Sequence, residues 1–294
     1  MVGVRFLLLR PRRKLPVRSP GLRMTGSGSV HRPAHRLTSG GREASDEIVA
    51  EEVAVALVYN GISHAVMMAT PADLEDLGVG FSLTERIVEN VAEIHDIQIE
   101  EVAVGSSGRG IEVRLEISAR RIAGLQARRR SLAGRTGCGL CGVESLDAAL
   151  RLVPVSPPSG PVSRQAIERA MSALPGLQTI NQMNGASHAA GWAGADGMLT
   201  VVREDVGRHN ALDKLAGALA RTGAAPGGGF VVVTSRCSYE MVQKAASLGA
   251  AAIAAVSAPT SLAIETAERA GIALAAFVRE GRLTVYANDE RITT

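Results

Sequence analysis

Hydrophobic and polar positions along the chain first predict a small β-rich portion. Four runs have the alternation or the apolar composition of strands: residues 51–59, 62–69, 96–104 and 111–117. The first two are parted by Asn60-Gly61, the dipeptide favoured in the type I′ turn of a β-hairpin. A Gly- and Ser-rich turn at 105–110 parts the other two. These runs predict a hairpin followed by two further strands.

A helix is expected after the second of these strands. Thr70 stands where an N-cap is expected, and Pro71 occupies the first helical position, where its missing N–H group costs nothing. The apolar side chains of the helix are expected to face a core: Leu74, Leu77, Phe81 and Leu83. A basic helical stretch ending near Arg130 follows the last strand and leads into residues 131–142.

The pattern changes after the Pro-, Ser- and Gly-rich linker 156–162. Helices and strands now alternate: helix 163–174, hairpin 186–204, helix 207–221, strand 230–234, helix 238–250, strand 251–256, helix 260–270, and strands 272–278 and 283–287. Val231-Val232-Val233 is apolar at every position, as expected of a strand that is covered on both faces. The β-α-β-α-β order predicts an α/β fold with a layered mixed sheet and helices on both faces.

Charge is distributed unevenly along the chain, so the net positive charge of the whole chain does not describe its body. The chain has 294 residues and a formal net charge of +3. Ten of its 32 Lys and Arg residues lie within residues 1–42, which contain no Asp or Glu. The other residues carry 22 basic and 29 acidic side chains, a net charge of −7. This acidic body argues against a broad nucleic-acid-binding surface.

The first 45 residues are expected to form a disordered basic leader, because their Arg-, Pro-, Gly- and Ser-rich composition cannot bury enough apolar surface to fold. Phe6-Leu7-Leu8-Leu9 is too short for the apolar region of a signal peptide. No run of about 18 apolar residues occurs, so no membrane span is expected. We therefore divide the body into an N-terminal α+β portion, 46–155, and an α/β portion, 163–294.

The segment most suggestive of a chemical reaction is the pair of thiols in Gly137-Cys138-Gly139-Leu140-Cys141-Gly142. Three cysteines do not make a disulfide framework, and they indicate a reducing cytoplasm and a chemical use for the pair. A helix predicted at 143–150 would place the thiols at its N-terminus, where the dipole stabilises a thiolate. The basic side chains upstream act in the same direction: Arg128, Arg129, Arg130 and Arg135. A thiolate attacks electrophilic sulfur, so persulfide or disulfide exchange fits best.

Three other uses of a cysteine pair have requirements that this sequence meets poorly. A structural zinc site needs four ligands and a second pair is missing, although Cys237 and His209 stand as distant candidates. A thioredoxin-like pair would directly follow a strand, whereas a basic Gly-Arg loop precedes this one. A zinc deaminase would contain His-x-Glu and Pro-Cys-x-x-Cys, and neither motif is present in the sequence. Cys237 itself is read as a small buried residue.

Further positive groups are expected where strands end and helices begin. Residues 202–214 place Arg203, Arg208 and His209 at the start of a helix, which is read either as a solvated helix entry or as an anion site. Residues 234–244 and 257–261 form two more strand-to-helix turns, in which Ser235 or Ser238 could cap a helix. Ligands of open α/β sheets bind at such turns, so one focused anion pocket is expected.

Taken together, the motifs resemble the FdhD family of formate dehydrogenase accessory sulfurtransferases. The resemblance covers about residues 48–292 and rests on segments in one order: 137–142, 203–214, 234–244, 257–263 and 277–286. It implies a cytidine-deaminase-like fold and a cytoplasmic protein. It also implies that a cysteine desulfurase supplies persulfide sulfur, which passes to the molybdenum of the bis-molybdopterin guanine dinucleotide cofactor, needed by the catalytic subunit of formate dehydrogenase. A homodimer is a further implication.

By the same resemblance, Cys138 is the first choice for the persulfide and Cys141 its partner. The stretch that resembles the cofactor-binding segment of the family is Phe277, Val278, Arg279, Glu280, Gly281 and Arg282. Our candidates for contact with the guanine nucleotides of the cofactor are this stretch together with Arg203, Arg208, His209, Ser235 and Arg236, and no resident metal is expected. The alternative is a zinc- or nucleotide-binding adaptor that chaperones a molybdoenzyme without moving sulfur.

Overall fold

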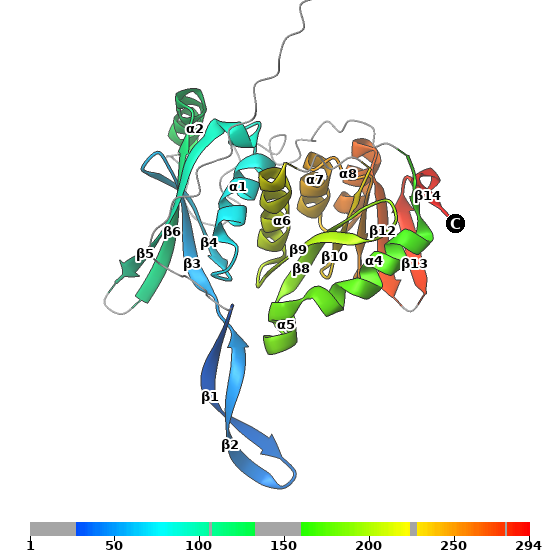
Figure 1. The fold of residues 1–294 in the computed structure, drawn as a ribbon, viewed down its shortest axis with the longest axis horizontal. Coiled ribbons are helices and arrows are strands. Elements are labelled where there is room, and N and C mark those ends of the chain that lie inside the picture. The colour runs from blue at the N-terminus through cyan, green and yellow to red at the C-terminus, as the bar shows by residue number, and fades with distance from the viewer. Residues whose placement is uncertain (1–27, 106–107, 133–159, 224–227, 280) are drawn as a thin grey trace, which may run out of the picture.

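A computed structural model describes residues 28–105, 108–132, 160–223, 228–279 and 281–294. The described chain is built around two sheets of four and six strands, which lie on the two sides of a central pair of helices, α1 (Leu74–Thr84) and α6 (Arg208–Thr222) (Figure 1). The segment with Cys138 and Cys141, the helix expected at 143–150 and most of the expected linker lie outside the described residues.

The N-terminal sheet has the strand order β4-β3-β6-β5. Its members are β3 (Val53–Tyr59), β4 (Ile62–Ala69), β5 (Ile94–Val104) and β6 (Gly108–Ile117), with the short helix η1 (Val91–Glu93) before β5 and α2 (Ala119–Leu132) after β6. The central strands β3 and β6 run parallel and their outer neighbours antiparallel. Alternate residues of β3 and β6 pack against α1, where Leu77 is fully buried. All four predicted strands are thereby confirmed.

The predicted turn is confirmed, whereas the predicted helix start is wrong. Asn60 and Gly61 both have positive φ, 47° and 78°, as a type I′ turn requires. Helix α1 begins at Leu74 rather than after Thr70, with Asp73 at the N-cap. Thr70 is used elsewhere, because its hydroxyl accepts a hydrogen bond from the backbone N of Val206 at 3.1 Å.

The larger sheet has the order β13-β12-β11-β10-β8-β9. Strands β10, β11 and β12 run parallel, and the other three are antiparallel to their neighbours. In chain order this portion contains α4 (Arg164–Leu177), α5 (Thr179–Asn184), β8 (His188–Ala193), β9 (Leu199–Asp205), α6, β10 (Phe230–Val233), α7 (Tyr239–Ser247), β11 (Ala252–Ala255), α8 (Ser261–Ala270), β12 (Ala273–Arg279) and β13 (Arg282–Ala287). Helix α5 was not anticipated from the sequence.

Helices cover both faces of this sheet, as predicted (Figure 1). On one face, Val231 and Val233 of β10 pack with apolar residues of α6, α7 and α8. On the other, Phe230 and Val232 pack against α4. The short strands β7 (Val162–Ser163) and β14 (Ile292–Thr293) pair beside this portion. A mixed sheet between helix layers is the expected α/β class.

The two portions meet where α1 and α6 come into backbone contact. A Cβ atom placed on Gly80 would lie 1.7 Å from the carbonyl O of Asp213, and one on Gly217 would lie 1.9 Å from that of Asp76. Only a residue without a side chain permits such an approach. Glycine at these two positions therefore determines how the N-terminal portion docks on the α/β portion.

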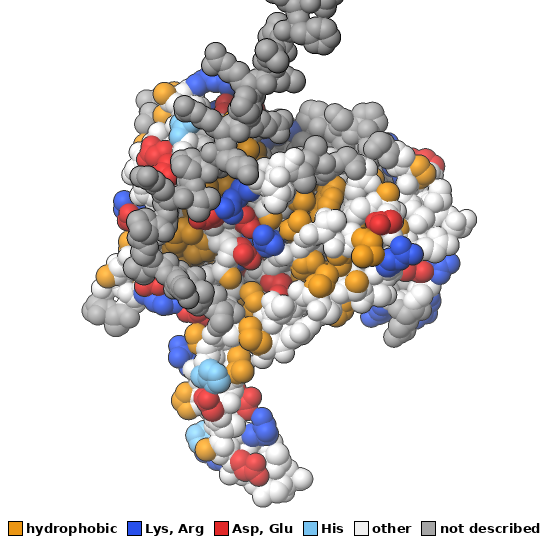
Figure 2. Space-filling view, viewed as in Figure 1, with side chains coloured by type: hydrophobic (Ala, Val, Ile, Leu, Met, Phe, Trp, Pro, Cys, Tyr) orange, Lys and Arg blue, Asp and Glu red, His pale blue; other side chains and the backbone are white. Residues whose placement is uncertain are grey.

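The expectation of a disordered leader is wrong for residues 29–45. Strands β1 (Ser29–Thr38) and β2 (Gly41–Ala50) form a hairpin that projects from the body, and Figure 2 shows positive, negative and His side chains interspersed along it. His31 Nδ1 lies 2.7 Å from Asp46 Oδ2, and Arg36 Nη2 lies 2.7 Å from Glu47 Oε1. The basic strand is thus neutralised by the acidic strand that follows it, and a charge count divided at residue 42 separates these partners. Residues 1–27 lie outside the described chain.

Within the part of the chain that the structure describes, no helix combines the length and apolar character needed to cross a membrane.

Candidate functional site at the strand ends

One edge of the larger sheet collects most of the predicted ligand-binding residues. The parallel strands β10, β11 and β12 end there. Because β8 is antiparallel to β10, and β9 to β8, the beginning of β8 and the end of β9 lie at the same edge. Helices α6, α7 and α8 begin directly after the turns of this edge. Donors at helix N-termini and strand-end side chains therefore face one region, as the switch-point rule predicts.

The turn before α6 is held by Asp205, the last residue of β9. Its Oδ1 atom accepts a hydrogen bond from the backbone N of Gly207 at 2.8 Å. Gly207 is the N-cap residue, and no side chain caps the helix. Arg208 follows at the first helical position, and its Nε atom is buried without a hydrogen-bond partner among the described residues. A buried, unpaired guanidinium N–H beside uncapped amides is a site prepared for an acceptor.

Helix α7 begins in the same way. Ser238 is its N-cap residue, but its hydroxyl makes no capping bond and is buried without a partner. By contrast, Thr260 caps α8 by accepting from the backbone N of Ala263 at 3.2 Å, and Ser163 caps α4. A Ser at an N-cap ordinarily satisfies a backbone donor with its own side chain. The starts of α6 and α7 therefore leave polar groups unsatisfied that the other two helices satisfy internally.

Two histidines flank these helix starts and are held neutral. His209 Nδ1 lies 3.1 Å from Glu240 Oε2, a close approach without hydrogen-bond geometry that brings the first turns of α6 and α7 together. Burial lowers the pKa of His209, against the attraction of Glu240. Burial and the nearby charge of Arg208 also lower the pKa of His188, at the start of β8. The positive charge here therefore comes from arginine.

The end of β12 and the turn that follows it have an unusual backbone. Phe277 has φ 53°, in the left-handed region that a bulky side chain rarely occupies, and the register with β13 shifts between Ala276 and Arg279. The turn is tied to α4, because Arg164 Nη2 donates to the carbonyl O of Gly281 at 2.7 Å. Strain of this kind persists only where surrounding structure imposes it, and it concentrates at ligand sites.

The structure brings some of the predicted residues together at this edge. Arg208, His209, Ser235, Arg236 and the described part of 277–282 lie on its turns and helix starts. Arg236 and Arg279 are exposed, Val278 is buried, and Gly281 and Arg282 are exposed. The hydroxyl of Ser235 donates to the carbonyl O of Arg236 at 2.9 Å, within its own turn. Glu280, Cys138 and Cys141 lie outside the described residues, so their predicted roles stay predictions.

Arg203 is placed differently from its neighbours. Its Nε atom donates to Asp76 Oδ2 of α1 at 2.8 Å, and Asp76 is also bonded by Arg221 Nη1 at 2.5 Å. Asp76 is almost fully buried, at 4% exposure. The charge of Arg203 is therefore already paired in the contact between the two portions, and its role as a nucleotide ligand stays a prediction.

Several ionisable residues of segments 203–214 and 234–244 form buried pairs, whereas the first of these segments was expected to be a solvated helix entry or an anion site. Lys214 Nζ lies 2.6 Å from Asp205 Oδ2, and both side chains are fully buried. Lys244 Nζ lies 2.7 Å from Asp213 Oδ1 and also donates to the Thr84 hydroxyl at 3.1 Å. A spacing of nine or more residues between opposite charges carries no local signal, so only the fold reveals these pairs.

Cys237 is confirmed as a buried residue rather than a reactive one. It is 0% exposed, and burial raises the pKa of its thiol to about 12. Its backbone joins two turns of the edge: its N donates to the carbonyl O of Ala258 at 3.1 Å, and its carbonyl O accepts from Thr260 N at 3.0 Å. Among the described side chains, no group of three or more His, Cys, Asp or Glu is placed to hold a metal ion.

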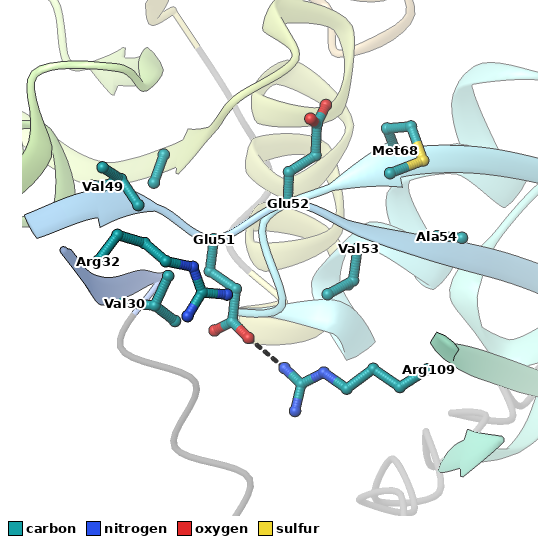
Figure 3. Close-up of a pocket in the computed structure, with 10 residues that line it drawn as sticks. Val30, Arg32, Val49, Glu51, Glu52, Val53, Ala54, Met68 and Arg109 are labelled. Atoms are coloured by element: carbon teal, nitrogen blue, oxygen red, sulfur yellow. Dashed lines mark hydrogen bonds and ion pairs between the residues drawn. The ribbon is translucent and has the colours of Figure 1, made fainter. Parts of the chain in front are cut away.

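A separate cavity of about 430 Å³ lies at the base of the projecting hairpin (Figure 3). Val30 and Val49 of the hairpin and Met68 of β4 supply apolar lining, whereas Arg32 and the ion pair between Glu51 and Arg109 make it polar. Among the residues that the structure describes, none of those predicted to bind the cofactor lines it.

Comparison with known proteins agrees with the fold and the motifs. Residues 50–293 match the FdhD/NarQ family. A sulfur carrier protein FdhD from Cupriavidus necator is 51% identical over 282 residues, covering 94% of this chain and 96% of that protein. The protein of that name from Chromobacterium violaceum is 52% identical over 266 residues, with 89% and 96% covered.

The same relationship extends to a solved structure. The crystal structure of a formate dehydrogenase accessory protein from Desulfotalea psychrophila superposes with a TM-score of 0.69 at 25% identity, covering 90% of this chain and 99% of that chain. Its coverage shows that the similarity includes both portions of the fold. The chain belongs to the FdhD/NarQ family, and its named relatives are sulfur carrier proteins.

Proposed function

We propose that this protein carries sulfur as a persulfide and passes it to the molybdenum of a bis-molybdopterin guanine dinucleotide cofactor destined for formate dehydrogenase. Membership of a family whose relatives are named sulfur carriers supports the general role. The name of the Desulfotalea psychrophila protein supports formate dehydrogenase as the client. The motifs that carry the more specific proposal are the cysteine pair and the strand-end edge.

The observation that carries the cofactor half of the proposal is the unsatisfied start of α6 and α7. The Arg208 Nε atom and the Ser238 hydroxyl are buried without partners, next to helix amides that no side chain caps. A diphosphate joins each guanosine of the cofactor to its molybdopterin, and the diphosphate oxygens accept several hydrogen bonds at once. Charge-assisted hydrogen bonds of this kind contribute about 1.5–3 kcal/mol each. A phosphate group supplies the negative charge and the acceptor oxygens that this donor set lacks.

Further residues of the same edge are proposed to complete the pocket. Arg236, Arg279 and Arg282 would pair with phosphate oxygens from the turns after β10 and β12. Phe277 is half-buried on β12 beside these residues, and its ring is proposed to contact the base. Arg203 is the weakest candidate of the set, since its guanidinium is engaged by Asp76.

The sulfur half of the proposal rests on Cys138 and Cys141. The Cys138 thiolate would attack the outer sulfur of a cysteine desulfurase persulfide, R–S–SH, forming Cys138–S–SH and releasing the desulfurase thiolate, R–S⁻, with no net oxidation or reduction. Cys141 is the partner or alternative carrier. Because the chemistry needs a free thiolate, we place the protein in the reducing cytoplasm. A homodimer would let two such pockets hold the two nucleotides of one cofactor.

Intact-mass measurement after incubation with a cysteine desulfurase and cysteine tests the sulfur role. The wild type should gain about 32 Da per persulfide sulfur, and the gain should be reversed by a thiol reductant. The Cys138→Ala variant should lose the main adduct, and Cys237→Ala is the matched control that should retain it. An adduct that survives in the Cys138→Ala/Cys141→Ala double variant would refute the assignment. Stoichiometric zinc that is bound by the wild type and missing from the same double variant would instead favour a metal-stabilised adaptor.

A further inference from the structure

We infer that Asp205 is a positioning residue: it does not contact the nucleotide but holds the turn that aims the N-terminus of α6 at it. The inference rests on the proposed function, because it assigns a role to the residue behind the proposed phosphate site. Asp205 is the last residue of β9 and is fully buried. It stands three residues before Arg208 and is separated from it by Val206 and Gly207.

Four donors saturate the Asp205 carboxylate. Its Oδ1 atom accepts from Gly207 N at 2.8 Å and from Asn210 Nδ2 at 3.0 Å. Its Oδ2 atom accepts from Thr70 N at 3.0 Å and lies 2.6 Å from Lys214 Nζ. A carboxylate oxygen accepts about two hydrogen bonds, so little capacity is left for any other partner. The side chain is therefore fixed in one orientation.

The turn depends on these side-chain bonds because its backbone amides donate to side chains rather than to backbone carbonyls. Gly207 N bonds to Asp205, and Val206 N bonds to the Thr70 hydroxyl at 3.1 Å. The first backbone bond of α6 begins only with Ala211 N, which donates to Gly207 O at 3.0 Å. The path of the chain from β9 into α6, and with it the direction of Arg208, is thus set by Asp205 and Thr70.

The same bonds tie the proposed phosphate site to the N-terminal portion. Thr70 follows β4, and Asn210 Nδ2 also donates to the carbonyl O of Met68 at 2.9 Å. Lys214 Nζ donates to the carbonyl O of Thr70 at 3.0 Å. The turn before α6 is therefore held between two parts of the chain more than 130 residues apart. It keeps its shape only while the two portions stay docked.

Lys214 gives this arrangement its electrostatic balance. A lone carboxylate at the start of α6 would repel a phosphate bound a few residues away. The ammonium group of Lys214 is 0% exposed and has no route to solvent, so it offsets the charge of Asp205 within the protein. Asp205 can then organise the turn through its hydrogen bonds without opposing an anion. Neither charge is available to bind the ligand itself.

The test compares two isosteric changes at buried acids of α6 and its entry. Asp205→Asn removes the acceptor for Thr70 N and the partner of Lys214. The matched control is Asp213→Asn, which disturbs an equally buried ion pair, with Lys244, further along α6. GDP serves as the probe because it reproduces the diphosphate end of the cofactor, and binding is followed by isothermal titration calorimetry. Persulfide loading by intact mass and the melting temperature are recorded for each variant.

We expect Asp205→Asn to raise the Kd for GDP by about tenfold or more, while Asp213→Asn changes it by less than about twofold at a similar loss of melting temperature. Persulfide loading should persist in both. Equal weakening of GDP binding in the two variants, or no weakening in Asp205→Asn, would overturn the positioning role. If Asp205→Asn does not fold, Asn210→Ala decides: it keeps both charges but removes one of the two hydrogen bonds to Oδ1, so unchanged GDP affinity would also overturn the inference.

The two levels of the proposal fail in different ways. If the wild type does not bind GDP, or Arg208→Ala binds it as tightly as the wild type does, the proposed phosphate site itself is refuted. If Arg208→Ala weakens binding and Asp205→Asn does not, the site stands and only the positioning role is lost.

Discussion

Helices α1 and α6 approach so closely that a single added methyl group should weaken the whole protein. We predict that Gly217→Ala is strongly destabilising, although alanine favours a helix by about 1 kcal/mol over glycine. The new Cβ atom would lie 1.9 Å from the carbonyl O of Asp76. An ordinary contact between carbon and carbonyl oxygen is about 3.3 Å or longer, so the helices would have to separate by about 1.4 Å.

Such a shift would break polar contacts as well as packing. Arg203 and Arg221 reach Asp76 across this interface at 2.8 and 2.5 Å, and Thr84 donates to Asp213 at 2.7 Å. Overpacking costs about 1–3 kcal/mol, and weakening of even one of these bonds adds about 1.5 kcal/mol or more. After the gain in helix propensity, we expect a net loss of about 3 kcal/mol. For a domain of about 250 residues this corresponds to a fall in Tm of about 6–12 °C.

Urea and thermal unfolding followed by circular dichroism measure this effect. Gly124→Ala in α2 is the matched control, because a Cβ atom there meets nothing within 4 Å. The control should be neutral or slightly more stable than the wild type. If Gly217→Ala lies within about 0.5 kcal/mol of the wild type, the close approach of α1 and α6 described here is incorrect.

Three further outcomes are expected. In a Cys138→Ala/Cys141→Ala background, Cys237 should resist iodoacetamide at about pH 8 and react only in denaturant, because burial raises the pKa of its thiol to about 12; labelling of the native protein would contradict this. Lys244→Met leaves the Asp213 carboxylate buried without its cation and should cost about 3–5 kcal/mol in urea unfolding, and a loss below about 1 kcal/mol would show that the pair is not buried. Burial lowers the pKa of His209, and a bound phosphate would raise it. GDP should therefore bind with proton uptake, and more tightly as the pH falls below about 6.5. Calorimetry of His209→Gln should show a flatter pH profile of GDP affinity, and an unchanged profile would show that His209 is not the group that takes up the proton.

Local signals in the sequence were sufficient for most of the secondary structure. Asn60-Gly61 determined a turn because both positions take positive φ without strain, and the unbroken apolar run at 231–233 identified a strand covered on both faces. The alternation of strands and helices then determined the sheet class. Where the pattern misled, the reason was a contact between residues far apart in the sequence. Thr70 has the right residue type for an N-cap, but its hydroxyl and backbone are used by the turn before α6.

The projecting hairpin shows where composition fails. Residues 29–42 look like a basic, unfoldable tail when they are read alone. His31 and Arg36 lie beside Asp46 and Glu47 of the following strand. The hairpin therefore forms through pairing with a neighbouring strand, which the composition of residues 29–42 alone does not reveal. The two-residue strands β7 and β14 pose the same difficulty, since each exists only through a partner about 130 residues away.

By itself, then, the sequence determined the class of the fold, and it predicts the cysteine pair as the place for sulfur chemistry and the strand-end turns as the place for an anion. It could do so because turn residues, periodicity and the polarity of strand ends are short-range properties. Only the tertiary structure decided which charges face a ligand and which neutralise each other. The sequence does not show that Asp205, Asp213, Lys214 and Lys244 are buried. The docking of α1 on α6 removes them from water, and a charge without water must find a partner inside the protein. Within the described part of the chain, Arg208 keeps an unpaired donor.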